Sequence, residues 1–308
     1  MRQGGVTVKS LGVFLLWVGL AAWDFSKSSI PLDEIVSGGP PKDGIPALDR
    51  PRFVSAKKAS RSFMKDRDRV IGLTVNGKAK AYPIKILNWH EIVNDRLGGR
   101  NVVVTFCPLC GTGMVFDAKA AGRVLTFGVS GLLYKSDVLM YDRQTESLWS
   151  QIKQQAVTGP MTGTSLTLLT STHTRWDAWR KRYPETFVLS TQTGHVRDYD
   201  RDPYAGYAAS DRVMFSVGKL NRQFHPKEPV IGVKLNGVAK AYPFSELAKM
   251  KSPFKDRVGE KTLWVVYDAP SRTATIKDAS GREVPTVTGF WFAWYAFHKD
   301  TQVFTAGK

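Results

Sequence analysis

The only two cysteines of this 308-residue chain lie in one short segment, Cys107-Pro108-Leu109-Cys110-Gly111. Any thiolate chemistry must therefore take place there. Two cysteines separated by two residues can close a small disulfide, exchange it with another dithiol, or provide two soft ligands to one metal ion. The neighbouring residues determine which of these uses is favoured.

Two other side chains could complete a metal site with the cysteine pair. His90 offers an imidazole, and Met114 offers a thioether four residues beyond Cys110. Structural zinc usually takes four protein ligands, whereas copper accepts fewer and softer ones. We predict a transition-metal site of Cys107, Cys110, His90 and Met114, with copper favoured and zinc possible. Such a site would act in electron transfer, metal delivery or oxidation; for Met114 alone, an ordinary core position is the alternative.

The placement of His90 beside the thiols follows from a predicted hairpin. Residues 90–95 are predicted to form one strand and the β-branched residues 101–106 a second, with Gly98-Gly99 as the turn. If the turn is centred on the two glycines, His90 is directly opposite Cys107 on one face of the sheet. A slip by one residue would move His90 to the other face.

Thiol exchange is the first alternative function. Proline after the first cysteine occurs in glutaredoxin-type motifs, and His90 could lower the pKa of Cys107. However, Gly111-Thr112-Gly113 follows the motif, where thioredoxin-like proteins begin a helix. This alternative is a thiol-disulfide oxidoreductase of the cell envelope with a protein redox partner. A third is a non-catalytic binding module in which the cysteines form a structural disulfide.

A second polar segment follows the cysteines, over residues 127–151. We expect Asp137 to orient a histidine or act as a base, and Tyr134 to donate a proton, beside the thiols. Glu91, next to His90, is the third catalytic candidate. Other polar residues of the segment, such as Asp142, are expected to form a self-satisfied turn network.

An internal repeat indicates the architecture. Residues 70–83 (VIGLTVNGKAKAYP) and 230–243 (VIGVKLNGVAKAYP) are identical at ten of fourteen positions, and each predicts a hairpin with an Asn-Gly turn. The second copy has no counterparts of His90, Cys107 or Cys110. We predict a mainly β protein (α+β with few short helices), in which two pseudo-repeated β-rich units pack into one compact body.

The chain divides into five predicted segments. Arg2 and Lys9 precede an uncharged run of about a dozen residues, shorter than the roughly 20 of a membrane-spanning helix, which is typical of an export signal. The segments are an export signal (1–25), an irregular leader (26–50), a first β-rich repeat with the cysteines (51–151), a connecting region with a short helix near 174–183 (152–229), and a second repeat without cysteines (230–308). The protein is expected to be exported, and periplasmic or membrane-associated.

The charge balance indicates the kind of partner. The chain has 44 Lys and Arg against 27 Asp and Glu, a net charge of +17. Outside the cytoplasm this favours an anionic membrane surface or an acidic envelope polymer, and we expect no nucleic-acid partner. The absence of GxSxG and HExxH motifs disfavours the hydrolases defined by those signatures. The sequence does not indicate an oligomeric state.

Several segments carry a family resemblance. They are FCPLCGTGMVFD, TFGVSGLLYKSDVLMYDRQTESLWSQ, the AKAYP repeats and FWFAWYAF. Together they resemble the bacterial family catalogued as domain of unknown function 3179, from about Asp43 to the carboxyl end. The resemblance implies an exported or envelope-associated bacterial protein. It also implies that the His-Glu, Cys-Pro-Leu-Cys and Tyr-Asp-Arg segments are hallmarks of the family, and it implies no reaction.

Overall fold

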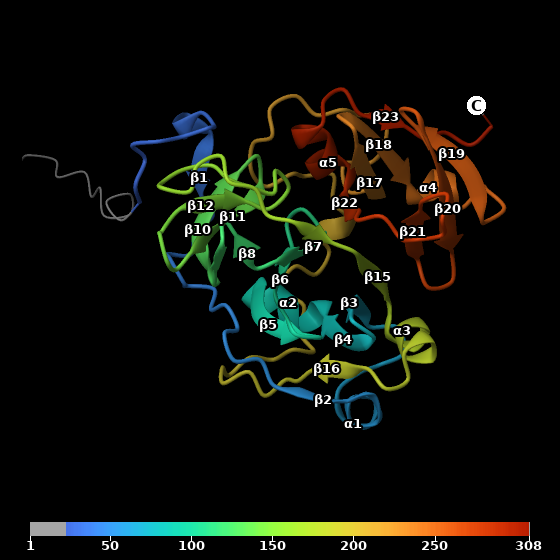
Figure 1. Ribbon diagram of the computed structural model, residues 1–308, viewed down its shortest axis with the longest axis horizontal. Helices are drawn as coiled ribbons and strands as arrows, with labels where there is room; N and C mark the ends of the chain where they lie inside the picture. Colours follow the sequence, from blue (N-terminus) through green and yellow to red (C-terminus); the bar gives the residue numbers. More distant parts are fainter. Residues whose placement is uncertain (1–22, 308) are drawn as a thin grey trace, which may run out of the picture.

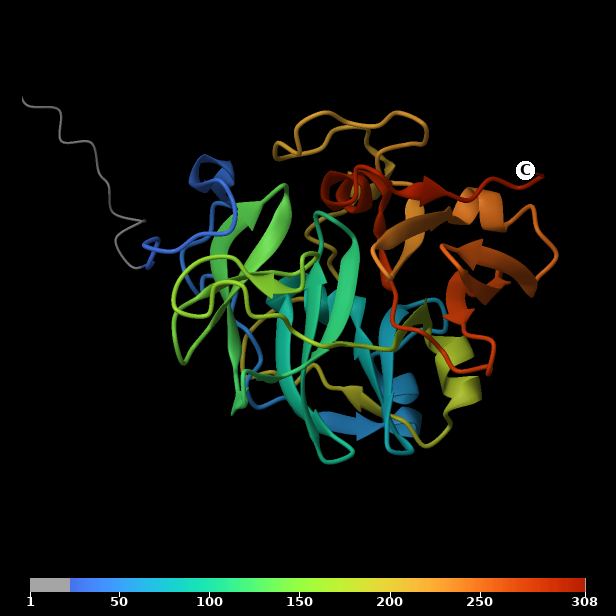
Figure 2. The same cartoon turned by 45° about the horizontal axis from the view of Figure 1, so that its top comes forward.

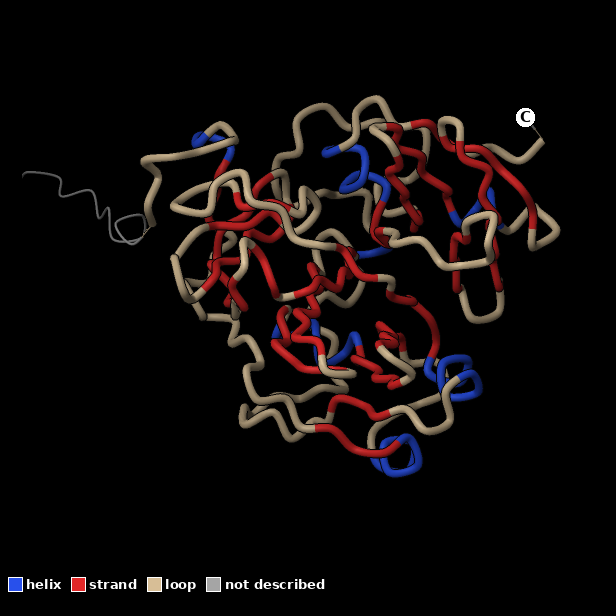
Figure 3. Tube along the Cα trace, viewed as in Figure 1, coloured by secondary structure: helices blue, strands red, loops and turns tan. Residues whose placement is uncertain are grey.

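The computed structural model describes residues 23–307. Strands dominate this range and the helices are short, which confirms the prediction of a mainly β protein with few short helices (Figure 3). Most of the predicted export signal, residues 1–22, lies outside the described residues. Among the helices of residues 23–307, none is long and apolar enough to cross a membrane.

The strands of residues 23–307 form five sheets (Figure 1). The first has the order β1 (Ile35–Ser37), β10 (Phe127–Tyr134), β11 (Asp137–Asp142), β12 (Leu148–Ser150) and β13 (Gln155–Ala156). The second has the order β23 (Gln302–Val303), β18 (Val238–Pro243), β17 (Pro229–Leu235), β22 (Val287–Phe290), β7 (Thr112–Asp117), β6 (Arg100–Cys107) and β5 (Ile92–Leu97), with β14 (Leu168–Leu169) also paired to β7.

The third sheet has the order β15 (Ser171–Arg175), β3 (Arg69–Val75), β4 (Lys78–Pro83), β16 (Phe187–Leu189) and β2 (Phe53–Ser55). The fourth comprises β19 (Phe254–Val258), β20 (Lys261–Asp268) and β21 (Thr273–Lys277), and the fifth β8 (Lys119–Ala120) and β9 (Arg123–Val124). The helices of the described range are α1 (Ala56–Ser62), α2 (Ile84–His90), α3 (Trp176–Arg182), α4 (Phe244–Leu247), α5 (Trp291–Phe297) and the 3-10 turns η1 (Leu32–Glu34) and η2 (Tyr207–Ala209).

The two repeated sequence segments form hairpins with the same register. Val70 pairs with Pro83 in β3–β4, and Val230 pairs with Pro243 in β17–β18. Both Asn-Gly turns have positive φ at both residues, as a type I′ turn requires. A short helix follows each hairpin, α2 in one case and α4 in the other. The similarity is thus local to these elements; the correspondence of two whole units stays a prediction.

Each of these hairpins carries a glycine under a tryptophan ring. A Cβ atom on Gly72 would lie 2.2 Å from Cζ3 of Trp179 in α3, and one on Gly232 would lie 2.3 Å from Cζ3 of Trp294 in α5. Both rings are almost fully buried. They cannot move aside without disturbing the packing of the helix to which they belong.

We expect the substitution Gly72→Ala to destabilise the fold by about 1–3 kcal/mol, because the added methyl group overpacks a filled site. Urea denaturation of the purified variant would measure the change in the free energy of unfolding. Adding Trp179→Phe should recover part of the loss, since the smaller ring leaves room for the methyl group. Equal stability of Gly72→Ala and the parent protein would contradict the expectation.

The amino-terminal segment runs along the body. Trp23 packs edge-to-face on Tyr141, with ring centroids 5.3 Å apart, and β1 pairs with β10. Further along, Leu48 forms a bridge with Val93 of β5. The predicted leader of residues 26–50 therefore contains one short strand and contacts two sheets.

Both halves of the chain contribute to one core around the cysteines. Thr288 of β22 pairs with Gly113 of β7, which joins the two halves in the eight-stranded sheet. A single core cluster contains Cys107, Cys110 and Trp291. The later part of the segment of residues 190–228, drawn in gold, arches over the top of the body in Figure 2. Val217 from this segment is buried in the same cluster.

Candidate metal centre

The cysteine pair lies in the tight turn between β6 and β7. Cys107 is the last residue of β6, and the N–H of Gly111 donates to the carbonyl of Pro108 across the turn at 3.3 Å. Gly111 has φ of +58°, a conformation that glycine adopts without strain. Both cysteines are free thiols and both are buried, at 2% and 0% exposure. The structure therefore does not contain the disulfide that the third alternative predicts.

The tip of a second hairpin, β10–β11, contacts the two thiols. Its two-residue turn is Lys135-Ser136, and both residues have positive φ, where Asn-Gly is normally preferred. This strained turn aims the carbonyl of Ser136 at the cysteines. The oxygen accepts from Cys110 Sγ at 3.1 Å and from Cys107 Sγ at 3.8 Å.

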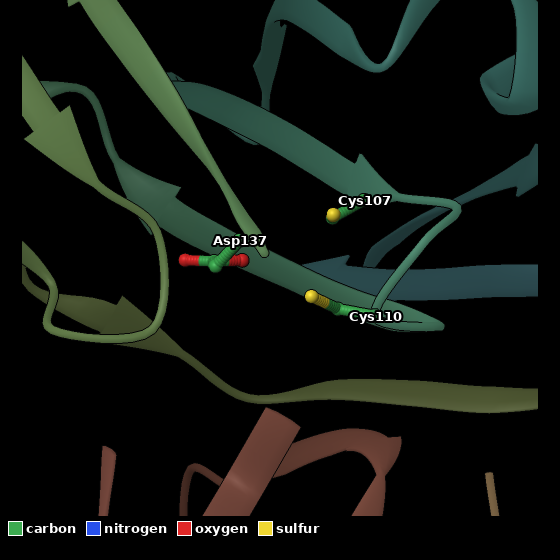
Figure 4. Close-up of side chains that lie close together, drawn as sticks. All are labelled: Cys107, Cys110 and Asp137. Atoms are coloured by element: carbon green, nitrogen blue, oxygen red, sulfur yellow. The ribbon is translucent and has the colours of Figure 1, made fainter. Parts of the chain in front are cut away.

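Asp137, directly after this turn, completes a group of three potential ligands. Sγ of Cys107, Sγ of Cys110 and one carboxylate oxygen of Asp137 all lie within 4.8 Å of one another. Figure 4 shows the three side chains pointing toward a common centre from β6, the β6–β7 turn and the start of β11. Oδ2 of Asp137 accepts from the N–H of Ile152 at 3.0 Å, but its buried Oδ1 accepts no hydrogen bond from the described residues.

Burial dominates the electrostatics of the group. It raises the pKa of Asp137 to about 8, although backbone N–H groups oppose the shift. Burial also raises the pKa of Cys110, and the neighbouring Cys107 and Asp137 add to that effect. Three acidic groups thus face each other in a low-dielectric interior, where only a proton or a cation can neutralise them.

The structure corrects the predicted position of His90. His90 is the last residue of α2 rather than part of a strand, so it does not lie opposite Cys107. Its Nδ1 is 2.8 Å from the carbonyl oxygen of Pro46, and its Nε2 is 2.7 Å from Oη of Tyr199. Burial lowers the pKa of His90 to about 4, so the ring is neutral. No imidazole belongs to the ligand group found among residues 23–307.

The predicted catalytic residues Glu91 and Tyr134 differ in how they relate to the thiols. Glu91 is buried, has φ of +55° where α2 ends, and has its pKa raised to about 8 by burial. Its charge raises the pKa of both Cys110 and Asp137, so it lies within electrostatic range. Tyr134 belongs to another core cluster and packs against Phe297, with ring centroids 5.7 Å apart. The catalytic roles of these residues stay predictions.

Met114 shares a face of the β6–β7 ladder with Cys107. It pairs with Thr105, two residues before Cys107, and its side chain lies in the core cluster that contains both cysteines. This position is that of an ordinary core residue next to the site. Its thioether role stays a prediction.

Sequence reasoning missed three contributors to the site. The carbonyl of Ser136 was not expected, although two apolar runs separated by Lys135-Ser136 are typical of a two-residue hairpin. Tyr204 and Tyr207 lie in the long segment of residues 190–228, within the predicted connecting region, and were not expected near the site. Burial raises the pKa of Tyr204, and the charges of Glu91 and Cys107 add to that effect, which indicates that its phenol lies near the centre. No local sequence pattern indicates that contact.

The fold and the site describe a mainly β protein with a buried group of two thiols and one carboxyl. A family model described as protein of unknown function (DUF3179) matches residues 42–301, most of the chain. The chain belongs to this family, as its sequence resemblance implied. No curated protein and no solved structure matches the chain.

Proposed function

We propose that the chain is a transition-metal protein whose ion is held by Cys107, Cys110 and Asp137. The observation that carries the proposal is the convergence of two free thiols and one carboxylate within 4.8 Å in a buried place. Ionised thiols and a carboxylate that are buried together lose their solvation, so the charged form of this group requires a cation. A bound ion would replace the protons that the thiols now direct at Ser136.

The ligand charges favour a divalent ion. Two thiolates and one carboxylate carry three negative charges, and the buried Glu91 is a further acid nearby. Zinc accepts sulfur and carboxylate ligands together, and three protein ligands with an open fourth position are typical of its catalytic sites. We therefore propose zinc first. The sequence favoured copper because it accepts fewer and softer ligands and Met114 could supply a thioether, but the third group beside the thiols is the carboxylate of Asp137. Copper is the second candidate and would imply electron transfer, metal delivery or oxidation.

One observation favours a second function, thiol–disulfide exchange. A buried carboxyl with a pKa of about 8 beside Cys110 could accept the proton that this thiol loses during exchange. Thiol exchange is disfavoured because both sulfurs are buried within the core, whereas the partner of an exchanging thiol must be able to reach it. The metal function is therefore the stronger proposal.

Metal titration would test the proposal. The purified reduced protein, stripped by chelator, should bind one equivalent of Zn²⁺ or Cu⁺, and Co²⁺ should give a sulfur-to-metal charge-transfer band. Cys107→Ser, Cys110→Ser and Asp137→Asn should each weaken binding at least about a hundredfold, since losing a direct ligand exceeds the 10–100-fold cost of a supporting residue.

Three matched controls separate this ligand set from other possibilities. His90→Gln, Met114→Leu and Glu91→Gln should each retain one metal equivalent, because none belongs to the group of three. Loss of binding in His90→Gln with retention in Asp137→Asn would overturn the ligand set. Absence of metal binding, together with glutathione-disulfide exchange that slows in Asp137→Asn, would select the second function.

The cellular setting is also a proposal. The apolar amino-terminal run supports export, and the net charge of +17 supports contact with an anionic membrane surface or acidic envelope polymer. Fractionation of cells that express the full chain would test both, with the protein expected outside the cytoplasm.

A further inference from the structure

A cavity of about 580 Å³ lies on the outer side of the cysteine turn. Pro108 and Gly111, from the turn itself, form part of its wall. Its volume is in the range of sites for small organic molecules. Other lining residues come from both halves of the chain, including β3, β22 and the segment of residues 190–228.

Three cationic side chains line this cavity: Arg69, Lys227 and Arg272. Arg69 donates to the carbonyl oxygens of Ser271 and Arg272, at 2.7 and 3.3 Å. Within residues 23–307, none of the three forms an ion pair with a carboxylate. Backbone carbonyls orient Arg69 but leave its charge unneutralised.

Lys227 is held in the same way. Its side chain is 3% exposed, and Nζ donates to the carbonyls of Ser210 and Arg212 at 2.5 and 2.6 Å. Nζ also lies 4.1 Å from the ring centroid of Tyr207. A buried ammonium with only carbonyl and aromatic partners favours a nearby anion.

The like charges are concentrated further by strand pairing. Arg69 of β3 is directly opposite Arg175 of β15, an arrangement that is destabilising unless another group offsets it. Arg175 has its own partner in Asp177, whereas Arg69 has none. Burial, with Arg272 and Arg175 nearby, lowers the pKa of Arg69 to about 10, so it remains cationic at neutral pH.

The cavity contains little negative charge. Asp202 is the one carboxylate among its lining residues, and it is engaged by Asn88 Nδ2 at 3.0 Å and by the N–H of Tyr204 at 2.9 Å. His173 also lines the cavity and is neutral, because burial lowers its pKa to about 3. Three cations thus oppose one carboxylate.

The remaining walls are largely aromatic. They are formed by the rings of Phe106, Tyr204, Tyr207, Phe244 and Phe290. Such a surface accepts the flat or apolar body of a ligand whose polar head is held elsewhere.

We propose that this cavity binds an organic anion, with a carboxylate or phosphate head at Arg69, Lys227 and Arg272 and an apolar body against the aromatic wall. The proposal is independent of the metal centre, because none of the three metal ligands lines the cavity. It adds a small-molecule site that is adjacent to the cysteine turn.

Calorimetric titration with model ligands would test the proposal. The full chain, with metal removed by chelator, is titrated with phenyl phosphate, benzoate and the neutral benzyl alcohol. We expect both anions to bind and benzyl alcohol to bind roughly tenfold more weakly or not at all, because charge-assisted hydrogen bonds are the strong contacts of such a site. Comparing the two anions shows whether the head group is a phosphate or a carboxylate.

Two charge-removing variants locate the site. Arg272→Gln alters an exposed side chain, and Arg69→Gln alters a more buried one; each should weaken anion binding roughly tenfold. Arg282→Gln is the matched control, because Arg282 pairs with Asp278 in an exposed turn and does not line the cavity. The proposal is overturned if no anion binds at millimolar concentration, if benzyl alcohol binds as tightly as benzoate, or if folded Arg272→Gln binds the anions as the parent does.

Discussion

Removing Cys110 is expected to abolish the stabilisation that a bound metal gives to the fold. Ligand binding to the native state raises the free energy of unfolding by about 4 kcal/mol when the free ligand is a thousandfold above its dissociation constant. Because Cys110 is fully buried beside Asp137, its loss removes a ligand that no other cysteine can replace. The stabilisation by Zn²⁺ in Cys110→Ser should therefore fall to about 1.4 kcal/mol or less, given binding at least about a hundredfold weaker.

Urea denaturation near neutral pH, in the presence of a non-thiol reductant, would measure this difference with and without Zn²⁺. His90→Gln is the suitable control. It changes a buried ring that bonds to Pro46 and Tyr199 but leaves the three ligands in place. The control should retain the full metal-dependent shift, whereas an equal shift in Cys110→Ser would show that the ion binds elsewhere.

The metal-free protein is expected to lose stability as the pH rises through the neutral range. Burial raises the pKa of Asp137 and of Glu91 to about 8, against about 4 for unfolded carboxyl groups. Between those values the folded state binds more protons than the unfolded state. The contribution of these two groups to stability therefore falls with increasing pH from about 4 to about 8, by up to about 1.4 kcal/mol per pH unit for each group, and it levels off above pH 8.

Buried histidines act in the opposite direction at lower pH. The pKa values of His90 and His298 are lowered to about 4 and that of His173 to about 3, so these rings add stability as the pH rises toward 6.5. Above about pH 7.5, one unit beyond the ordinary pKa of histidine, they are almost fully neutral in both states. The window from about pH 7.5 to 8 therefore isolates the carboxyl groups.

Asp137→Asn should remove the contribution of Asp137 to this slope. Between pH 5 and pH 8 the metal-free parent should therefore lose several kcal/mol more stability than the metal-free variant. Denaturation at a series of pH values, with chelator present, would measure it. Glu91→Gln should remove the remaining slope. A pH profile of Asp137→Asn that is parallel to that of the parent would contradict the raised pKa of this carboxyl group.

The error at His90 shows where sequence reasoning stops. The register of the β5–β6 hairpin follows from Gly98-Gly99, and the structure has the predicted pairing, with Leu97 opposite Arg100. However, α2 has only seven residues, too few to show a helical repeat of apolar positions. Glu91 then reverses the chain with a positive φ that no sequence rule assigns to glutamate.

The part played by Asp137 could be anticipated, but its partners could not. The polar segment of residues 127–151 placed Asp137 beside the thiols, as the partner of a histidine or as a base. Its approach to Cys110 depends on how the β10–β11 hairpin packs on the β6–β7 turn. These two turns are about twenty-five residues apart in the sequence. Contacts of this kind come from tertiary packing, and local propensity carries no information about them.

The carboxyl-terminal half has no cysteine, yet it reaches the cysteine turn. The N–H of Phe290 donates to the carbonyl of Cys110 at 2.8 Å, and the Phe290 ring lies against Gly111. A fragment truncated before β17 would leave that carbonyl and the open edge of β7 exposed to solvent. The later half thus shields one backbone carbonyl of the cysteine turn, although it supplies none of the three candidate ligands.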